Sequence, residues 1–76
     1  MVFEKLKRVI LEYIEIDDED FVAELSFVED LGFDELDMAD LTMDVEDGFG
    51  IELSDESLEA IKTIGDLVKF IENNIE

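Results

Sequence analysis

Apolar residues recur at spacings of three and four along most of this sequence, and that periodicity limits the fold to packed helices. Phe3, Leu6 and Ile10 fall on one face in this way, so we expect a helix over residues 2–16. The acidic residues 17–20 oppose the dipole at the C-terminal end of this helix and should end it. The chain has no proline, which fits helices joined by short loops.

Each later helix is expected to open on a side-chain oxygen that can cap it. The cap residues are Asp34, Ser54 or Asp55, and Thr63. Asp37 and Asp66 follow two of these caps at capping-box spacing. These signals predict a long helix over residues 34–49, a short one that ends near residue 61, and a last one after Thr63. The expected fold is all-α, a small four-helix bundle with three main helices and one short third helix, in one domain of residues 1–76.

The stretch over residues 21–32 is expected to be a connection held down by apolar side chains. The expected anchors are Phe21, Val22, Leu25, Phe27, Val28 and Leu31. Within this stretch Ser26 and Glu29 also have capping-box spacing, so a short turn should begin at Ser26.

The charge of the chain indicates which kinds of partner it can bind. It has 24 acidic against 5 basic residues, a formal net charge of -19, and no positive side chain between Arg8 and Lys62. We therefore expect basic protein surfaces and metal cations as partners, and neither nucleic acid nor an anionic membrane. Solubility or salt adaptation is the alternative explanation of the acidity. The 47% apolar content argues against disorder.

Several kinds of chemistry are excluded by composition. Without cysteine and histidine the chain can build no disulfide, no Cys/His zinc site and no Ser–His or Cys–His nucleophile pair, so we expect no enzyme and no catalytic residue. No window has the acid, glycine and glutamate spacing of a calcium loop. We expect weak binding of divalent cations at acidic clusters and no dedicated metal site.

The N-terminal segment "MVFEKLKRVI" carries charges that interrupt any signal-peptide core, and no apolar run approaches the roughly 20 residues of a membrane span. We expect a soluble, cytoplasmic monomer.

The helix over residues 34–49 should present two apolar stripes and one acidic stripe. The stripe expected to face the core consists of Leu41, Val45 and Phe49. The second apolar stripe consists of Leu36, Ala39 and Met43. The acidic stripe consists of Asp37, Asp40, Asp44 and Asp47.

The acidic stripe works against the helix that carries it. Asp40 and Asp44 form a like-charge pair that costs roughly 0.2–0.5 kcal/mol, and no lysine or arginine on this helix offsets it. Beside the second apolar stripe, such charge suggests a docking surface that steers a basic partner and holds it by apolar contacts. A solvated face on a globally acidic protein is the alternative.

Three segments together resemble the acyl carrier proteins of fatty-acid and polyketide synthesis, over essentially the whole chain. They are "SFVEDLGFD" at 26–34, "ELDMADLTMDVEDGFGIEL" at 35–53 and "SDESLEAIKTIGDLVKFI" at 54–71. The resemblance implies the four-helix bundle of that family, a place in lipid metabolism, and docking on carrier-binding enzymes through the second helix. The residues it assigns to partner binding are Asp34, Leu36, Asp37, Ala39, Asp40, Met43, Asp44, Glu46 and Asp47.

In that family an Asp-Ser-Leu motif opens the second helix, and its serine hydroxyl receives 4'-phosphopantetheine from coenzyme A. Here the motif reads Asp34-Glu35-Leu36, so the attachment position holds no hydroxyl. Attack by a carboxylate would give an acyl phosphate, which hydrolyses. The other hydroxyls lie elsewhere in the pattern, and no cofactor is expected on the chain as written.

Glu35 admits three interpretations. An acidic residue in the first helical turn is favourable by roughly 0.3–1 kcal/mol, which suffices to explain it. Alternatively it supplies the negative charge that the phosphodiester would have carried, or it replaces a serine by design. The function predicted is an arm-free module that docks on basic surfaces of carrier-binding enzymes. The alternative is a genuine acyl carrier protein with its attachment serine substituted, or modified at an unexpected hydroxyl.

Overall fold

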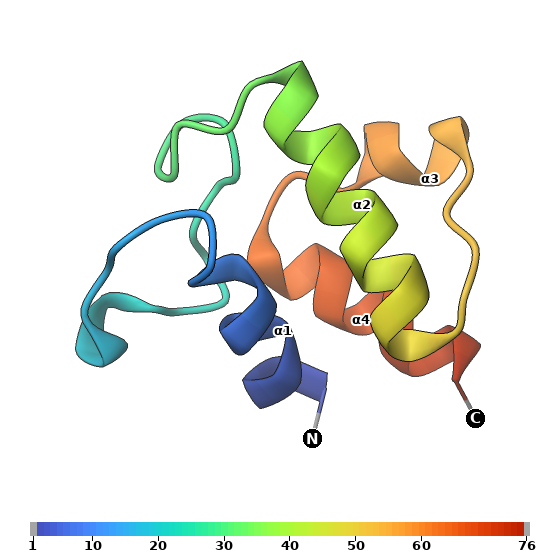
Figure 1. Ribbon diagram of the computed structural model, residues 1–76, viewed down its shortest axis with the longest axis horizontal. Coiled ribbons are helices and arrows are strands. Elements are labelled where there is room, and N and C mark those ends of the chain that lie inside the picture. The colour runs from blue at the N-terminus through green and yellow to red at the C-terminus, as the bar shows by residue number, and fades with distance from the viewer. Residues whose placement is uncertain (1, 76) are drawn as a thin grey trace.

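The computed structural model describes residues 2–75, and in that range the regular elements are helices (Figure 1). They are α1 (Val2–Ile10), the 3-10 turn η1 (Asp18–Asp20), α2 (Glu35–Phe49), α3 (Asp55–Ala60) and α4 (Ile64–Asn74). In Figure 1 α2 crosses the front of the molecule, α4 lies behind it, and α1 lies at one side. The predicted all-α bundle of three main helices and one short third helix is confirmed.

The core is a single apolar cluster to which every helix, or the residue that follows it, contributes. Its buried members are Leu6, Ile10, Phe21, Phe27, Phe33, Leu41, Val45, Ile61, Ile64, Leu67 and Ile71. In the stripe of α2 predicted to face the core, two residues are buried and Phe49 is half-buried against the cluster. Each side chain of this size that is fully buried contributes about 1.5–3 kcal/mol relative to exposure. This burial holds the chain together against its own charge.

Both long helices after the connection begin where their caps predict. The Asp37 N–H donates to Oδ1 of Asp34 at 2.8 Å, and the Asp34 N–H donates back to Oδ2 of Asp37 at 3.3 Å. Thr63 and Asp66 repeat this capping box at the start of α4. These reciprocal bonds satisfy N–H groups that a helix terminus leaves without partners.

The short helix α3 is capped by Ser54, whose hydroxyl accepts the Ser57 N–H at 3.2 Å. This settles the choice between Ser54 and Asp55 that the sequence left open. At the other end of α2, Gly50 adopts a left-handed conformation (φ 68°) and closes the helix, as glycine does without steric cost.

The first helix is shorter than predicted, since it ends at Ile10 and not near residue 16. After Ile10 the backbone tightens into bonds between residues three apart, with Tyr13 N–H donating to Ile10 O at 2.9 Å, and then becomes irregular. Glu12 and Glu15 add to the carboxylates that oppose the helix dipole here. Tyr13 is held instead by contacts with Phe33 and Asp44, which lie far along the sequence.

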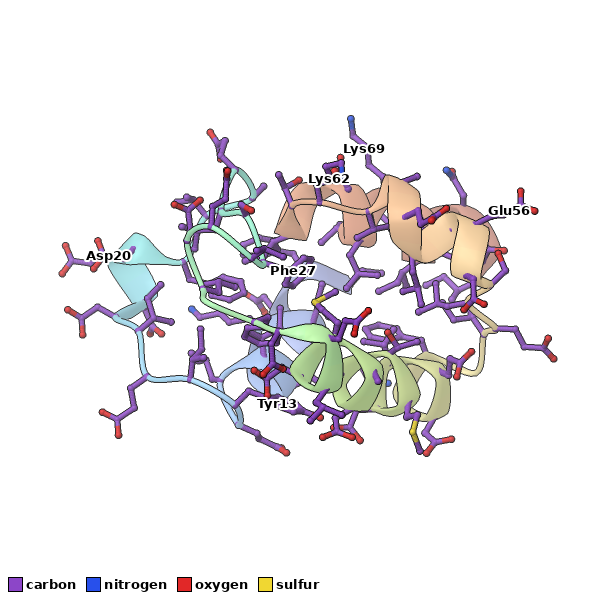
Figure 2. The ribbon with its side chains drawn as sticks, turned by 90° about the horizontal axis from the view of Figure 1, so that it is seen from above. Tyr13, Asp20, Phe27, Glu56, Lys62 and Lys69 are labelled. Carbon is purple, nitrogen blue, oxygen red and sulfur yellow. The ribbon has the colours of Figure 1, made fainter. Side chains whose placement is uncertain are left out.

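The long connection before α2 is anchored by aromatic rings. Phe21, Phe27 and Phe33 are buried, whereas Val22 and Val28, expected as anchors, are 43% and 64% exposed. Backbone bonds tie the connection to the α3–α4 junction, and the isolated bridge between residues 26 and 63 belongs to this set. Figure 2 shows Phe27 in the interior, between α2 and the α3–α4 side. The connection thus holds the N-terminal end of α2 in place.

The connection and α4 approach each other closely at one glycine. The Gly65 N–H donates to Ala23 O at 2.8 Å, and a Cβ on Gly65 would lie 3.2 Å from both Cβ and O of Ala23. This spacing is tighter than an ordinary van der Waals contact, so a glycine lets the two backbones meet.

The predicted turn at Ser26 is present. Its hydroxyl accepts the Glu29 N–H at 3.1 Å, and its own N–H donates to Oδ2 of Asp30 at 2.7 Å. This turn places Val28 and Glu29 beside the start of α2.

Candidate functional site

The outer face of α2 exposes large apolar side chains next to acidic ones. Leu36 is 76% exposed and Met43 62% exposed, and Ala39 is exposed between them. Asp40 and Asp47 are exposed as well. Because residues three and four apart are neighbours on a helix surface, Leu36, Asp40, Met43 and Asp47 form one line along α2. We call these four residues the α2 ridge.

Some carboxylates assigned to partner binding also serve the fold. Oε2 of Glu46 accepts the Leu53 N–H at 2.7 Å and ties down the link to α3. A carboxylate oxygen of Asp44 accepts the Tyr13 hydroxyl proton. Asp34 and Asp37 bind each other's backbone in the capping box.

Three other carboxylates on α2 have no such contact. Within residues 2–75, no hydrogen bond or ion pair engages the side chains of Glu35, Asp40 or Asp47, and all three are exposed. Their charge is therefore available to a partner, and two of the three lie on the α2 ridge.

Tyr13 is a residue of this face that sequence reasoning did not single out. It lies beside α2 (Figure 2), its ring packs against Phe33 with centroids 5.9 Å apart, and its hydroxyl donates to Asp44. The hydrogen bond to Asp44, followed by burial and the negative charge nearby, raises the pKa of Tyr13 to about 12. Nothing in the sequence near Tyr13 pointed to a partner in α2.

The C-terminal end of α2 receives its positive charge from α1. Lys5 Nζ donates to Gly48 O at 2.5 Å and lies 4.8 Å from the centroid of the Phe49 ring. A cation at this end complements the helix dipole, which the acidic residues of α2 oppose. Helix α2 is thus stabilised by a lysine that its own sequence lacks.

A groove of about 900 Å³ lies beside the N-terminal half of α2, between this helix, α3 and the turn that begins at Ser26. Its lining residues are Ser26, Phe27, Val28, Glu29, Glu35, Met38, Ala39, Asp55, Leu58, Glu59, Ile61 and Lys62. Glu35 therefore stands at the edge of a groove with apolar walls. The sequence did not reveal this groove, because its lining comes from separate segments.

Glu35 occupies the first position of α2, directly after the cap, where its side chain is exposed and anchored to no neighbour in the described range. At this exposed position, an attached group would be accessible to other proteins. The chemistry does not fit, since a carboxylate cannot form the stable phosphodiester that a serine hydroxyl forms. Ser26 is the nearest alternative in the groove lining, but its hydroxyl already accepts the Glu29 N–H. The residues present thus do not fit a covalently attached arm at this position.

A small helical bundle with an acidic second helix, and with an exposed residue directly after the cap of that helix, has the arrangement of a carrier protein. The family described as "Phosphopantetheine attachment site" matches residues 4–71. The acyl carrier protein of Wolinella succinogenes is 44% identical over 73 residues, which cover 96% of each chain. The chain belongs to the acyl carrier protein family, and its recognition from sequence is confirmed.

Solved structures show the same fold. A candidate acyl carrier protein from Mycobacterium tuberculosis superposes with a TM-score of 0.86 at 30% identity, covering 96% of this chain and 97% of that one. A second one, from Anaplasma phagocytophilum, has a TM-score of 0.84 at 24% identity and covers 95% and 85% of the two chains. At this lower identity the likeness shows the fold alone.

Two further findings bear on partners. In the part of the chain that the structure describes, no helix is long and apolar enough to cross a membrane. Across residues 2–75, no cluster of three or more acidic side chains has the arrangement needed to hold a metal ion.

Proposed function

We propose that this protein is an arm-free member of its family, which docks through the exposed face of α2 on basic surfaces of carrier-binding enzymes. One observation carries the proposal: the attachment position at the start of α2 holds Glu35, while the exposed acidic and apolar side chains of that helix are retained. Cytoplasmic location, a monomeric state and a role in fatty-acid metabolism go with this proposal.

The positions assigned to docking divide into two groups. The α2 ridge with Ala39 and Glu35 provides free charge and apolar surface for a partner. The other assigned acids, Asp34, Asp37, Asp44 and Glu46, add negative potential while their oxygens hold the fold. Opposite charge on a partner then raises the association rate, and the apolar contacts slow dissociation.

The alternative is a genuine carrier that is modified at an unexpected hydroxyl. The 44% identity to an acyl carrier protein over nearly the whole chain favours it. This form of the alternative differs from the proposed function in whether the unaltered chain takes up an arm. The other form, a carrier whose attachment serine is substituted in this version, is tested by whether the natural gene encodes serine at position 35.

A loading assay separates them. The unaltered chain and Glu35→Ser are incubated with coenzyme A and a broad-specificity phosphopantetheinyl transferase, and both are weighed by mass spectrometry. We expect no mass gain for the unaltered chain and a gain of one arm for Glu35→Ser. A gain of one arm on the unaltered chain would overturn the proposal, and Ser26→Ala would then show whether the groove hydroxyl carries it.

Docking is measured as competition in the same system. The unaltered chain should inhibit loading of a separate acyl carrier protein by the transferase. Reversing both ridge charges with Asp40→Lys and Asp47→Lys should raise the inhibition constant at least about tenfold, or about 1.4 kcal/mol. Glu19→Lys with Asp20→Lys reverses two exposed charges at η1, away from α2 (Figure 2), and should change little. Equal weakening by both changes would show that only net charge matters.

A further inference from the structure

The groove beside α2 has apolar walls, and the proposed arm-free chain carries no attached group that could fill it. Phe27 and Ile61 are buried in its lining, Met38 and Leu58 are half-buried, and Val28 is 64% exposed at its edge. In an arm-free chain nothing attached at Glu35 can occupy this space, so an occupant must arrive without a covalent bond.

The charges around the groove indicate the charge that its occupant should carry. Four carboxylates line it, those of Glu29, Glu35, Asp55 and Glu59, against the single cation of Lys62. All five side chains are exposed, and the chain as a whole has a net charge of -19. A free fatty acid would bring a further negative charge into this field, which disfavours it, whereas a positively charged molecule is attracted.

The groove and the α2 ridge are neighbours. Ala39 lines the groove and is spaced three residues from Leu36 and four from Met43, so it lies beside both on the helix surface. Its methyl group is too small to form a wall between the ridge and the groove. A segment that lies along the ridge can therefore pass a side chain over Ala39 into the groove.

We propose that the groove receives a large apolar side chain from a basic amphipathic segment of the docked partner. This rests on the proposed function, since it takes the ridge as the docking surface. The positive charges of the segment meet Asp40, Asp47 and the acidic groove edge, while its apolar side chain is buried between Met38 and Leu58. The groove then supplies the specificity that the exposed charges alone lack.

The test uses a synthetic helical peptide of lysine and alanine with one tryptophan as its only large apolar side chain. The protein has no tryptophan, so all tryptophan emission comes from the peptide. With the unaltered protein we expect saturable binding and a shift of the emission to shorter wavelength. A peptide in which alanine replaces the tryptophan should bind at least about tenfold more weakly.

A matched pair of variants locates the burial. Ala39→Phe should occupy the groove, remove the emission shift and weaken binding at least about tenfold. Ala60→Phe makes the same change at an exposed position of α3 that does not line the groove, and should leave both unchanged. Far-UV circular dichroism of both variants confirms that the helices are intact.

Two results would overturn the inference while leaving the proposed function in place. In the first, the peptide binds and loses affinity with Asp40→Lys and Asp47→Lys, but its emission stays that of tryptophan in water. In the second, the peptide gives no emission shift, whereas submicellar dodecanoate binds the unaltered protein and fails to bind Ala39→Phe, which would assign the groove to free acyl chains. Unchanged affinity after reversal of the ridge charges would instead contradict the proposed function itself.

Discussion

At the scale of single residues, Glu35 limits the chemistry that is possible at the start of α2. It follows the helix cap and its side chain is exposed, but a carboxylate cannot form the stable phosphodiester that loading at this position requires. Of the three interpretations of the glutamate, two can be separated on the protein itself: favourable interaction with the helix dipole, and a charge that stands in for a phosphodiester. They differ in whether loss of the charge should weaken docking or only lower the free energy of unfolding.

Glu35→Gln distinguishes them. If the charge serves docking, this change should weaken inhibition of the transferase by a factor of about 1.4 to 5, as loss of one exposed ion pair of about 0.2–1 kcal/mol implies. Glu35→Asp keeps the charge and should retain most of the inhibition. If inhibition is unchanged and only the free energy of unfolding falls, by roughly 0.3–1 kcal/mol, the dipole suffices as the explanation.

Tyr13 gives a second prediction at this scale, with a sign fixed by its raised pKa. The folded chain holds the phenol proton more tightly than the unfolded chain, whose tyrosine has a pKa of about 10. The stabilisation is therefore fully present below pH of about 10 and is lost as pH rises toward about 12, the pKa of the folded chain. Because Tyr13 is the only tyrosine, absorbance of the ionised phenol reports it directly.

The control for this titration removes the acceptor. Asp44→Ala takes away both the hydrogen bond and the nearest negative charge, so the midpoint should move back toward 10. A midpoint near 10 in the folded, unaltered chain would contradict the Tyr13–Asp44 contact.

At the scale of elements, the starts of the helices could be predicted and the end of α1 could not. Asp34, Ser54 and Thr63 act on N–H groups two or three residues away, so their effect can be read from local sequence. Beyond the end of α1, Tyr13 is held by Asp44, which is 31 residues along the chain. Contacts of that range have no local signal.

The same distinction holds for the functional surface. The apolar stripe of Leu36, Ala39 and Met43 is predicted from helical spacing on one element, and Leu36 and Met43 are exposed as expected. The groove requires residues from the turn, α2 and α3 to come together, which spacing alone does not indicate. Val28 illustrates the difficulty, since an apolar residue in a connection suggests an anchor until the fold shows it exposed.

The capping box of α2 yields the prediction that belongs to this scale. Asp34→Ala should lower the free energy of unfolding by about 1 kcal/mol, because it removes the acceptor for the Asp37 N–H. Asp34→Asn removes the same charge but keeps an acceptor, and should cost less. Urea unfolding followed by circular dichroism measures both, and equal losses would show that charge, not capping, matters at this position.

At the scale of the whole molecule, a small fold must stay compact although its formal net charge is -19. Three of the five cations lie on α1, and two of them make contacts that join elements: Lys5 with the end of α2, and Lys7 with Asp18 of η1 at 3.0 Å. α1 packs against both α2 and α4. Helix α1 thus supplies positive charge at two junctions of an otherwise acidic body, and the net negative charge that remains weakens the fold by self-repulsion.

Ionic strength should therefore stabilise the free protein. The molecule measures 29 × 26 × 19 Å. The Debye length is about 30 Å at 0.01 M salt and about 10 Å at 0.1 M, so only at the higher concentration are distant carboxylates screened from one another. We expect the melting temperature to rise by about 4–8 °C over this range, as about 1 kcal/mol implies for a chain of this size. Inhibition of the transferase should weaken over the same range, because salt screens the attraction between protein and partner as well as the repulsion within the protein.

Two salts at equal ionic strength separate screening from specific binding. Sodium chloride and tetramethylammonium chloride should give the same rise in melting temperature if repulsion across the molecule is the cause. Magnesium chloride should give a somewhat larger, gradual rise, and calorimetry with calcium should show weak binding without a defined stoichiometry. A melting temperature that falls with salt would mean that contacts such as Lys7–Asp18 outweigh the repulsion, and the acidic coat would then not limit the stability of this fold.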